Sequence, residues 1–203
     1  MKIYDLSPEI SEDMAVYKNK IEKKPKIKRI KNGANESRLE LDSHTGSHVD
    51  APYHFIGNGK TIDALDLQKF FGNAAVLDFT KLKGSIKKSD ILKSKINIKK
   101  NDIVLLKTKT KPTKSFDFNF VYLEKSGAEF LASRKVKAVG IDTLGIERNQ
   151  PNHPTHNILL SRNIPIFEGL NLSKIKQGKY WFYGFPLKIR DGDASPVRAL
   201  LLD

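Results

Sequence analysis

Short segments in which apolar and polar residues alternate, or in which β-branched residues gather, recur along the whole chain. Both patterns are typical of β-strands, because successive strand residues face opposite sides of a sheet. The segments predicted as strands are Ile3–Leu6, Ile27–Ile30, Arg38–Asp50, Ala75–Asp78, Ile103–Lys107, Ala138–Asp142, Ile164–Ile166, Tyr180–Tyr183 and Ala199–Leu202. Between the second and third of them, Asn32 and Gly33 predict a tight turn, since both residues tolerate a positive φ.

Helical periodicity is confined to a few segments. Those predicted as helices are Asp63–Phe71, Lys88–Lys95 and Leu123–Lys135, the last with a clear apolar stripe. Because these helices are interleaved with the strands, the pattern predicts one α/β domain with a mixed sheet over residues 1–203.

The strand predicted over Arg38–Asp50 gathers ligand-type side chains on one face. With a period of two, the residues that point to this face are His44, Gly46, His48 and Asp50. Gly46 is expected to leave space between the larger side chains. Pro52 cannot donate to a sheet ladder, so the strand should end near it, and the chain can then return His54 toward the same point.

Histidine is concentrated in two places along the chain. Three of the five histidines lie in the run His44–His54 together with Asp50, and the other two, His153 and His156, lie near Glu168. Imidazole and carboxylate are the ligands of zinc, manganese and iron. The chain has no cysteine, so disulfides are excluded and any metal must be bound by N and O atoms. A metal site is therefore favoured over unrelated polar residues on a half-exposed strand.

Composition and charge narrow the function classes. The chain has 203 residues, of which 39% are hydrophobic, enough for the core of one domain. Its net charge of +13 is carried mostly by lysines spread along the sequence, without the arginine and aromatic clusters of nucleic-acid readers. A solvated lysine surface is thus favoured over nucleic-acid binding, and the positive field could also attract an anionic small substrate. With no apolar signal segment or membrane span visible, a cytoplasmic protein without membrane contact is expected.

The run from His44 to Phe55, HTGSHVDAPYHF, resembles the signature His-x-Gly-Thr-His-x-Asp-x-Pro-x-His-Phe of the cyclase family of metal-dependent hydrolases. That family includes bacterial kynurenine formamidase and isatin hydrolase. Ser47 stands in place of the usual threonine and keeps the hydroxyl group. Later segments that resemble family blocks are Gly140–Thr143, His156–Leu160, Ile166–Leu170, Phe185–Ile189 and Gly192–Arg198. The resemblance covers nearly the whole chain and implies the formamidase-like swivelling β/β/α fold.

The resemblance also implies roles for individual residues. The metal ligands that it implies are His44, His48, Asp50, His156 and Glu168. Asp50 and Glu168 would bridge two ions, either Zn²⁺ or Mn²⁺, with one or two ions per subunit. A metal-bound water would be the nucleophile. His54 would be the general base and acid rather than a ligand, taking a proton from this water and returning it to the leaving nitrogen.

Other residues near these motifs receive weaker roles. His153 is expected in a loop outside the site, Asp142 is expected to be a strand-end carboxylate, and Ser47 is expected to form hydrogen bonds rather than act as a nucleophile. The stretch Met14–Lys20 departs from the Pro-Val-Trp-Pro-Gly pattern of the formamidases. Tyr17 keeps an aromatic ring there and is the expected substrate contact.

The activity implied is hydrolysis of a C–N amide bond in a small molecule. It resembles that of arylformamidase, in which N-formylkynurenine and water give kynurenine and formate. A cyclic-amide hydrolase of the isatin type and a non-catalytic metal- or ligand-binding protein remain as alternatives. By resemblance alone, a homodimer or homotetramer is expected.

Overall fold

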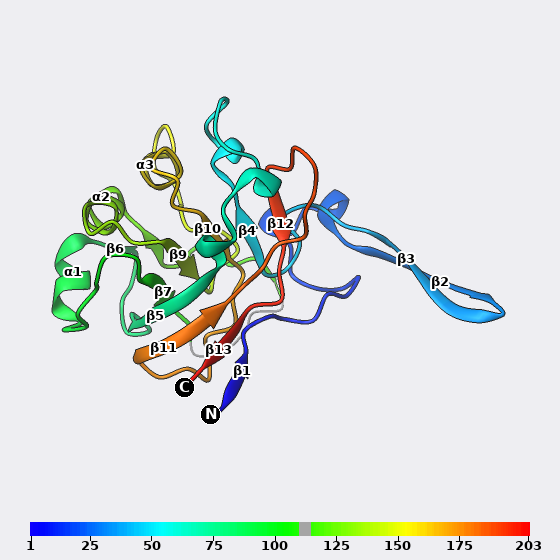
Figure 1. Ribbon diagram of the computed structural model, residues 1–203, viewed down its shortest axis with the longest axis horizontal. Helices are drawn as coiled ribbons and strands as arrows, with labels where there is room; N and C mark the ends of the chain where they lie inside the picture. Colours follow the sequence, from blue (N-terminus) through cyan, green and yellow to red (C-terminus); the bar gives the residue numbers. More distant parts are fainter. Residues whose placement is uncertain (110–114) are drawn as a thin grey trace.

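A nine-stranded mixed sheet organises the computed structural model, which describes residues 1–109 and 115–203 (Figure 1). The strand order is β1-β13-β11-β5-β7-β9-β10-β4-β12. Their bounds are β1 Ile3–Asp5, β4 His48–Asp50, β5 Phe71–Asp78, β7 Ile103–Lys107, β9 Ala138–Ile141, β10 Ile166–Glu168, β11 Gly178–Tyr183, β12 Ala194–Pro196 and β13 Leu200–Leu202. Neighbours from β5 to β10 are parallel and the outer pairs are antiparallel, so the predicted mixed sheet is confirmed.

Two apolar cores lie on the two faces of this sheet. The helices are α1 Lys88–Lys93, α2 Lys125–Ser133 and α3 Pro154–Leu160, and they lie together beside the sheet (Figure 1). Leu106 of β7 packs in the core that contains α2 residue Leu131, whereas its neighbour Leu105 packs on the opposite face with Phe182. The central parallel strands are therefore buried on both sides, which explains their continuous apolar sequences.

A hairpin of β2 (Lys26–Asn32) and β3 (Ala34–Glu40) extends away from the rest of the molecule (Figure 1). It turns at Gly33, whose φ is +75°, so the turn predicted at Asn32 and Gly33 is confirmed. The side chains of the hairpin are mostly exposed. A second small sheet pairs β6 (Ser85–Ile86) with β8 (Tyr122–Leu123).

The prediction of one strand over Arg38–Asp50 is wrong. β3 ends at Glu40, a turn follows, and β4 begins at His48. Gly46 in the turn has a φ of +65°, a left-handed conformation that a strand cannot contain. The predicted alternation therefore holds only within β4, and His44 reaches the same region from the turn.

The helix predicted over Asp63–Phe71 is also wrong. This segment contains two 3₁₀ turns, η4 (Ile62–Ala64) and η5 (Leu67–Phe70). Asp66 between them is extended, and its side chain accepts a hydrogen bond from the Gln68 backbone N–H at 2.9 Å. This local bond begins a new turn and interrupts any continuous helical ladder.

The helices predicted over Lys88–Lys95 and Leu123–Lys135 are confirmed as α1 and α2. The sequence pattern misses α3, which has only seven residues and begins with Pro154 after the left-handed His153. In the part of the chain that the structure describes, no helix has the length and apolar character needed to cross a membrane.

Candidate functional site

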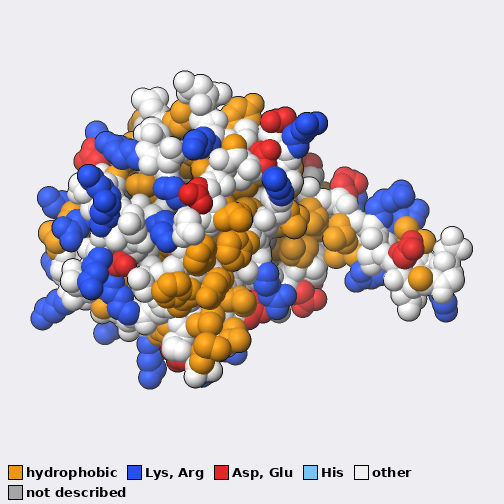
Figure 2. Space-filling model, in the orientation of Figure 1, with side chains coloured by type: hydrophobic (Ala, Val, Ile, Leu, Met, Phe, Trp, Pro, Cys, Tyr) orange, Lys and Arg blue, Asp and Glu red, His pale blue; other side chains and the backbone are white. Residues whose placement is uncertain are grey.

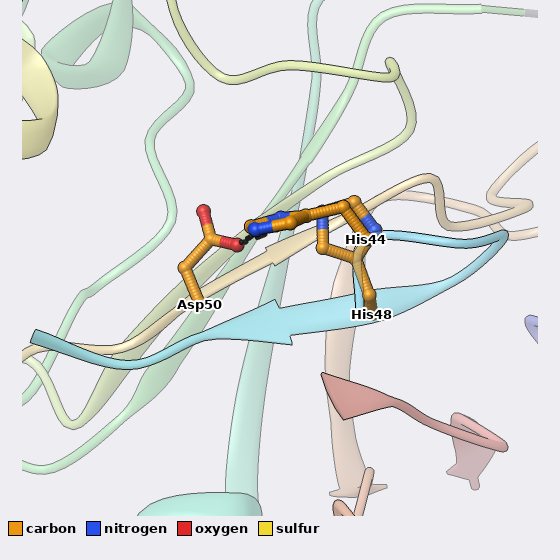
Figure 3. A group of neighbouring side chains, drawn as sticks. All are labelled: His44, His48 and Asp50. Carbon is orange, nitrogen blue, oxygen red and sulfur yellow. Dashed lines mark ion pairs between the residues drawn. The ribbon is translucent and has the colours of Figure 1, made fainter. Parts of the chain in front are cut away.

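The side chains of His48 and Asp50 project from the same face of β4, because they are two residues apart in a strand. His44 approaches them from the preceding turn (Figure 3). His44 Nδ1 lies 3.0 Å from Asp50 Oδ1, and His48 Nε2 lies 3.6 Å from the same oxygen. One ligand atom from each residue lies within 4.8 Å of the others, so the group can hold one ion.

Two glycines shape the turn that presents His44. At Gly46 the positive φ redirects the chain, and its carbonyl lies 3.0 Å from His48 Nδ1, which leaves Nε2 facing the site. A Cβ at Gly169 would collide with the Gly46 carbonyl. Ser47 Oγ donates to the Gly169 carbonyl at 2.8 Å, which agrees with the hydrogen-bonding role expected of it. Gly46 thus serves the turn and does not act as a spacer between ligands.

Glu168 and His156 come from distant elements and meet Asp50. β10 pairs with β4 so that Glu168 lies opposite His48, while His156 is on α3. Glu168 Oε2 lies 3.5 Å from His48 Nε2, and Glu168 Oε1 lies 3.7 Å from His156 Nε2. The ligand atoms of Asp50, His156 and Glu168 also lie within 4.8 Å of one another. Asp50 therefore belongs to two groups that can each hold an ion.

Among residues 1–109 and 115–203, some buried polar atoms at the centre of the site have no hydrogen bond of good geometry. They are His48 Nε2 and both carboxylate oxygens of Asp50. The exposed fraction is 3% for His48 and 1% for Asp50. The imidazole nitrogens of His44 and His48, 3.0 and 3.6 Å from Asp50 Oδ1, leave this buried carboxylate without a well-formed hydrogen bond. A buried carboxylate in that state is costly, and a cation beside it removes the cost. The nitrogen and oxygen donors suit a divalent ion, so the residues present fit a metal.

The titration of these side chains reflects the crowding of imidazoles and carboxylates. Burial disfavours the charged form of His44, but the carboxylates of Asp50 and Asp193 outweigh it and raise the pKa of His44 to about 9. At His156 burial is also outweighed by neighbouring carboxylates, and its pKa rises to about 9. Burial alone would raise the pKa of Glu168, but the adjacent imidazoles hold it well below its usual range.

His54 ends the 3₁₀ turn η3 (Pro52–His54), which brings its ring back to the site. The ring centroids of His54 and His44 are 4.3 Å apart, and His54 Nδ1 lies 3.4 Å from Asp193 Oδ2. Burial lowers the pKa of His54, so its imidazole is neutral at pH 7 and can accept a proton. His54, His44 and Asp193 also form a group with ligand spacing, so the geometry permits either a base or a ligand.

The sequence prediction does not include two carboxylates of the site. Glu147 Oε2 lies 2.7 Å from His156 Nδ1 and accepts the His156 backbone N–H at 3.1 Å. Asp193 Oδ2 lies 2.9 Å from His44 Nε2. Such partners orient an imidazole. Asp193 lies in the Gly192–Arg198 block that resembles the family, which was a usable signal, whereas Glu147 lies in a loop without a recognisable pattern.

His153 and Asp142 differ in their relation to the site. His153 is exposed, but its ligand atom lies within 4.8 Å of those of Glu147 and His156. The expectation that His153 lies outside the site is therefore wrong. Asp142 accepts hydrogen bonds from the Thr108 backbone N–H at 2.9 and 3.0 Å, and burial raises its pKa. Asp142 is thus a strand-end carboxylate, as expected.

A cavity of about 310 Å³ opens over both ligand groups. Its lining includes the metal-ligand candidates His44, His48, His156 and Glu168, the apolar residues Val16, Phe55 and Leu144, and the lysines Lys18, Lys20 and Lys23. Tyr17, the residue expected to contact substrate, also lines it. The site is therefore open to a small molecule.

Known proteins resemble the chain along most of its length. Residues 4–148 match the family described as "Putative cyclase". Kynurenine formamidase from Polaromonas naphthalenivorans (strain CJ2) is 29% identical over 99% of this chain and 91% of its own. Cyclase-like protein 3 from Oryza sativa subsp. japonica is 31% identical over 85% of this chain and 68% of its own.

Solved structures confirm the predicted fold class. A potential metal-dependent hydrolase with cyclase activity superposes with a TM-score of 0.90 at 42% identity, covering 98% of this chain and 96% of its own. An isatin hydrolase bound to the product analogue thioisatinate superposes with a TM-score of 0.89 at 23% identity, covering 100% and 92%. At that lower identity the likeness concerns the fold alone.

Proposed function

The chain belongs to the cyclase family, and on this premise we propose that it is a metal-dependent hydrolase of a C–N amide bond. One observation carries most weight: among the described residues, buried atoms of His48 and Asp50 have no hydrogen bond of good geometry, and they lie beside His156 and Glu168, which line an open cavity together with His48. These atoms suit the binding of a metal ion, and the cavity would let a small molecule reach that ion. Several relatives are named kynurenine formamidase, which supports an amide as the bond that is cleaved.

The donor atoms divide between two ion positions. His44, His48 and Asp50 would hold one ion, and Asp50, His156 and Glu168 would hold the other. Zn²⁺ or Mn²⁺ suits this set, with one or two ions per subunit. A divalent ion, when bound, supplies a Lewis acid that polarises a carbonyl and lowers the pKa of a water.

His54 would act as the general base and then as the general acid. It takes a proton from the water whose oxygen bonds to the carbonyl carbon, and it gives this proton to the nitrogen as the C–N bond breaks. The products are a carboxylic acid and an amine, so no further reactant is needed. Asp193, 3.4 Å from His54 Nδ1, would orient the ring and leave Nε2 for the water.

The favoured reaction is that of an arylformamidase, N-formylkynurenine and water giving kynurenine and formate. The apolar wall of Val16, Tyr17 and Phe55 supports a substrate with a flat apolar body, and Tyr17 would contact it. The test is hydrolysis of N-formylkynurenine, formanilide and isatin by protein loaded with Zn²⁺ or Mn²⁺. Turnover of isatin alone would favour a cyclic-amide hydrolase. Turnover of none of the three compounds would favour a non-catalytic metal- or ligand-binding protein.

We also propose that residues 1–203 form a single hydrolase domain and that copies of this chain assemble into a homodimer or homotetramer. The β2–β3 hairpin is a two-stranded ribbon, which is marginally stable without a covering layer.

Figure 2 shows apolar side chains gathered over β11 and the segment after it. The partly exposed residues there include Trp181, Phe185, Leu187 and Ile189. An exposed patch of this kind is typical of an interaction surface, and a second copy of the chain would cover it.

A further inference from the structure

A further set of potential metal ligands lies beside the two inner ion positions. The ligand atoms of Glu147, His153 and His156 lie within 4.8 Å of one another, and all three residues line the cavity. We propose that they form an outer cation position, which binds Zn²⁺ present in excess over the inner positions and thereby lowers the activity. The binding of zinc stands on its own, whereas the loss of activity rests on the proposed hydrolase function.

The His156 ring has one nitrogen on the side of each group. Its Nε2 lies 3.7 Å from Glu168 Oε1, among the inner ligands, and its Nδ1 lies 2.7 Å from Glu147 Oε2. Because the two nitrogens of an imidazole point in different directions, an ion beside Glu147 does not occupy the inner position. The outer position is therefore separate from the inner ones, although it shares His156 with one of them.

The carboxylate of Glu147 has room for one more partner. Its Oε2 accepts the His156 backbone N–H and contacts Nδ1 of the same residue, and its Oε1 accepts from Gln150 Nε2 at 3.0 Å. An ionised carboxylate offers about four lone-pair sites, so these contacts leave one for an ion. Glu147 is only 6% exposed, and solvent ions therefore screen its attraction for a cation weakly.

His153 brings a second imidazole to the cavity. It directly precedes α3, but its side chain forms no hydrogen bond that caps the helix. The centroid of its ring lies 5.2 Å from that of Phe55 and 6.1 Å from that of His156. His153 is exposed, so an ion can reach it directly from the solvent.

Two imidazoles and one glutamate, with a fourth position open to water, form a donor set that binds zinc. At bonds of about 2.1 Å, the ligand atoms of a tetrahedral zinc ion lie roughly 3.4 Å apart. Glu147 Oε2 and His156 Nδ1 must therefore separate by roughly 0.7 Å from their 2.7 Å, and the hydrogen bond between them breaks. The ion takes the place of the Nδ1 proton, which passes to the solvent. Loss of this proton is costly, so the outer position fills only after the inner ones.

An outer ion would oppose hydrolysis in two ways. It replaces the contact through which Glu147 orients His156 as an inner ligand. It also stands in the cavity through which a small molecule reaches the inner positions. Excess zinc should therefore inhibit the protein.

Equilibrium dialysis against increasing free Zn²⁺, followed by elemental analysis, tests the outer position. Once the inner positions are filled, wild-type protein should bind one Zn²⁺ per chain more than His153→Asn. Asparagine tolerates the left-handed backbone of His153, φ 48°, but lacks the imidazole nitrogen. Loss of a residue that only orients a ligand weakens metal binding about 10- to 100-fold, so loss of this ligand should weaken outer binding at least about tenfold.

Asn152→Ala is the matched control. Asn152 is the exposed neighbour of His153, it is also left-handed with φ 61°, and it does not belong to the ligand group. This variant should bind as many ions as the wild type, and the inner ions should bind equally in all three proteins. Equal zinc contents in wild type and His153→Asn, loss of the outer ion from Asn152→Ala, or loss of inner ions from His153→Asn would overturn the proposal.

Hydrolysis rates at the same zinc concentrations distinguish failure of this proposal from failure of the hydrolase function. The wild-type rate for formanilide should rise as the inner positions fill and then fall, and the fall in His153→Asn should need at least about tenfold more zinc. A wild-type rate that stays high in excess zinc, or the same fall in His153→Asn, would refute the inhibitory role. If formanilide, N-formylkynurenine and isatin all stay uncleaved, the proposed hydrolase function is wrong, and the dialysis still decides the outer position.

Discussion

His54 is the residue on which the chemistry depends, because its position suits either proton transfer or metal binding. If it is the base, His54→Ala should lower kcat/KM for amide hydrolysis by about 10²- to 10⁴-fold while the metal content stays that of the wild type. His48→Ala, in contrast, should lose metal, since it removes a buried nitrogen that faces the carboxylates of Asp50 and Glu168. Elemental analysis beside the rate measurement checks both. Loss of metal from His54→Ala would make His54 a ligand.

Protonation of His44 and His156 should oppose metal binding. Their pKa values rise from 6.5 to about 9 in the metal-free fold, so both hold protons at pH 7 that an ion must displace. Metal affinity should therefore increase from pH 7 to about 9 and then level off, with release of about two protons when both positions fill. Calorimetry in buffers of different ionisation enthalpy measures this release.

The same shifts predict the stability of the metal-free protein. A histidine with a raised folded-state pKa stabilises the fold fully below pH 6.5, and this contribution is lost as the pH rises through about 9. The melting temperature of chelator-treated protein should thus fall across this window. Glu168 remains ionised there, because its pKa lies below its usual range, and it adds no slope. A flat profile would show that His44 and His156 are not charged in the metal-free fold.

At the scale of elements, the join between β10 and the turn before β4 should be sensitive to one added methyl group. Gly169, directly after Glu168, has φ +66°, and a Cβ there would strike the Gly46 carbonyl. Gly169→Ala should cost about 2–5 kcal/mol through left-handed strain and overpacking, and it should weaken metal binding by displacing Glu168. Gly33→Ala is the control, since it has φ +75° but open space around it, and should cost about 1–2 kcal/mol. Urea unfolding compares them, and equal costs would contradict the clash.

Regular elements made part of this site predictable. His48 and Asp50 share a face because they lie two residues apart in β4, and period two is visible in sequence. His44 reaches the same place through a turn at Gly46, whose positive φ leaves no mark in the apolar pattern. Glu147 and Asp193 contact His156 and His44 through tertiary packing, so no spacing rule could find them, and only the resemblance of the Gly192–Arg198 block to the family pointed to Asp193.

At the scale of the whole molecule, the site joins segments from distant parts of the chain. β4 lies between β10 and β12, so the early His48 and Asp50 meet Glu168 of β10 and the residues just before β12. Asp193 precedes β12, and α3 adds His156. Because the group of Asp50, His156 and Glu168 draws on β4, α3 and β10, it exists only once these elements have packed together. An ion bound there would stabilise the folded chain by mass action.

The exposed β2–β3 hairpin leads us to expect that the protein is an oligomer in solution. Its side chains are mostly exposed and it projects from the body, which suggests that a second copy supplies the missing layer (Figure 1). Light scattering after size exclusion should give two or four times the chain mass of 22.9 kDa. Replacing residues 28–38 by two glycines should reduce the mass of the assembly to that of one chain while the metal content stays unchanged, since the hairpin is separate from the nine-stranded sheet. Gly33→Ala, which keeps the hairpin, should retain the wild-type mass. A wild-type mass of one chain would refute the assembly, and an unchanged mass after shortening would move the interface to the apolar patch around Trp181.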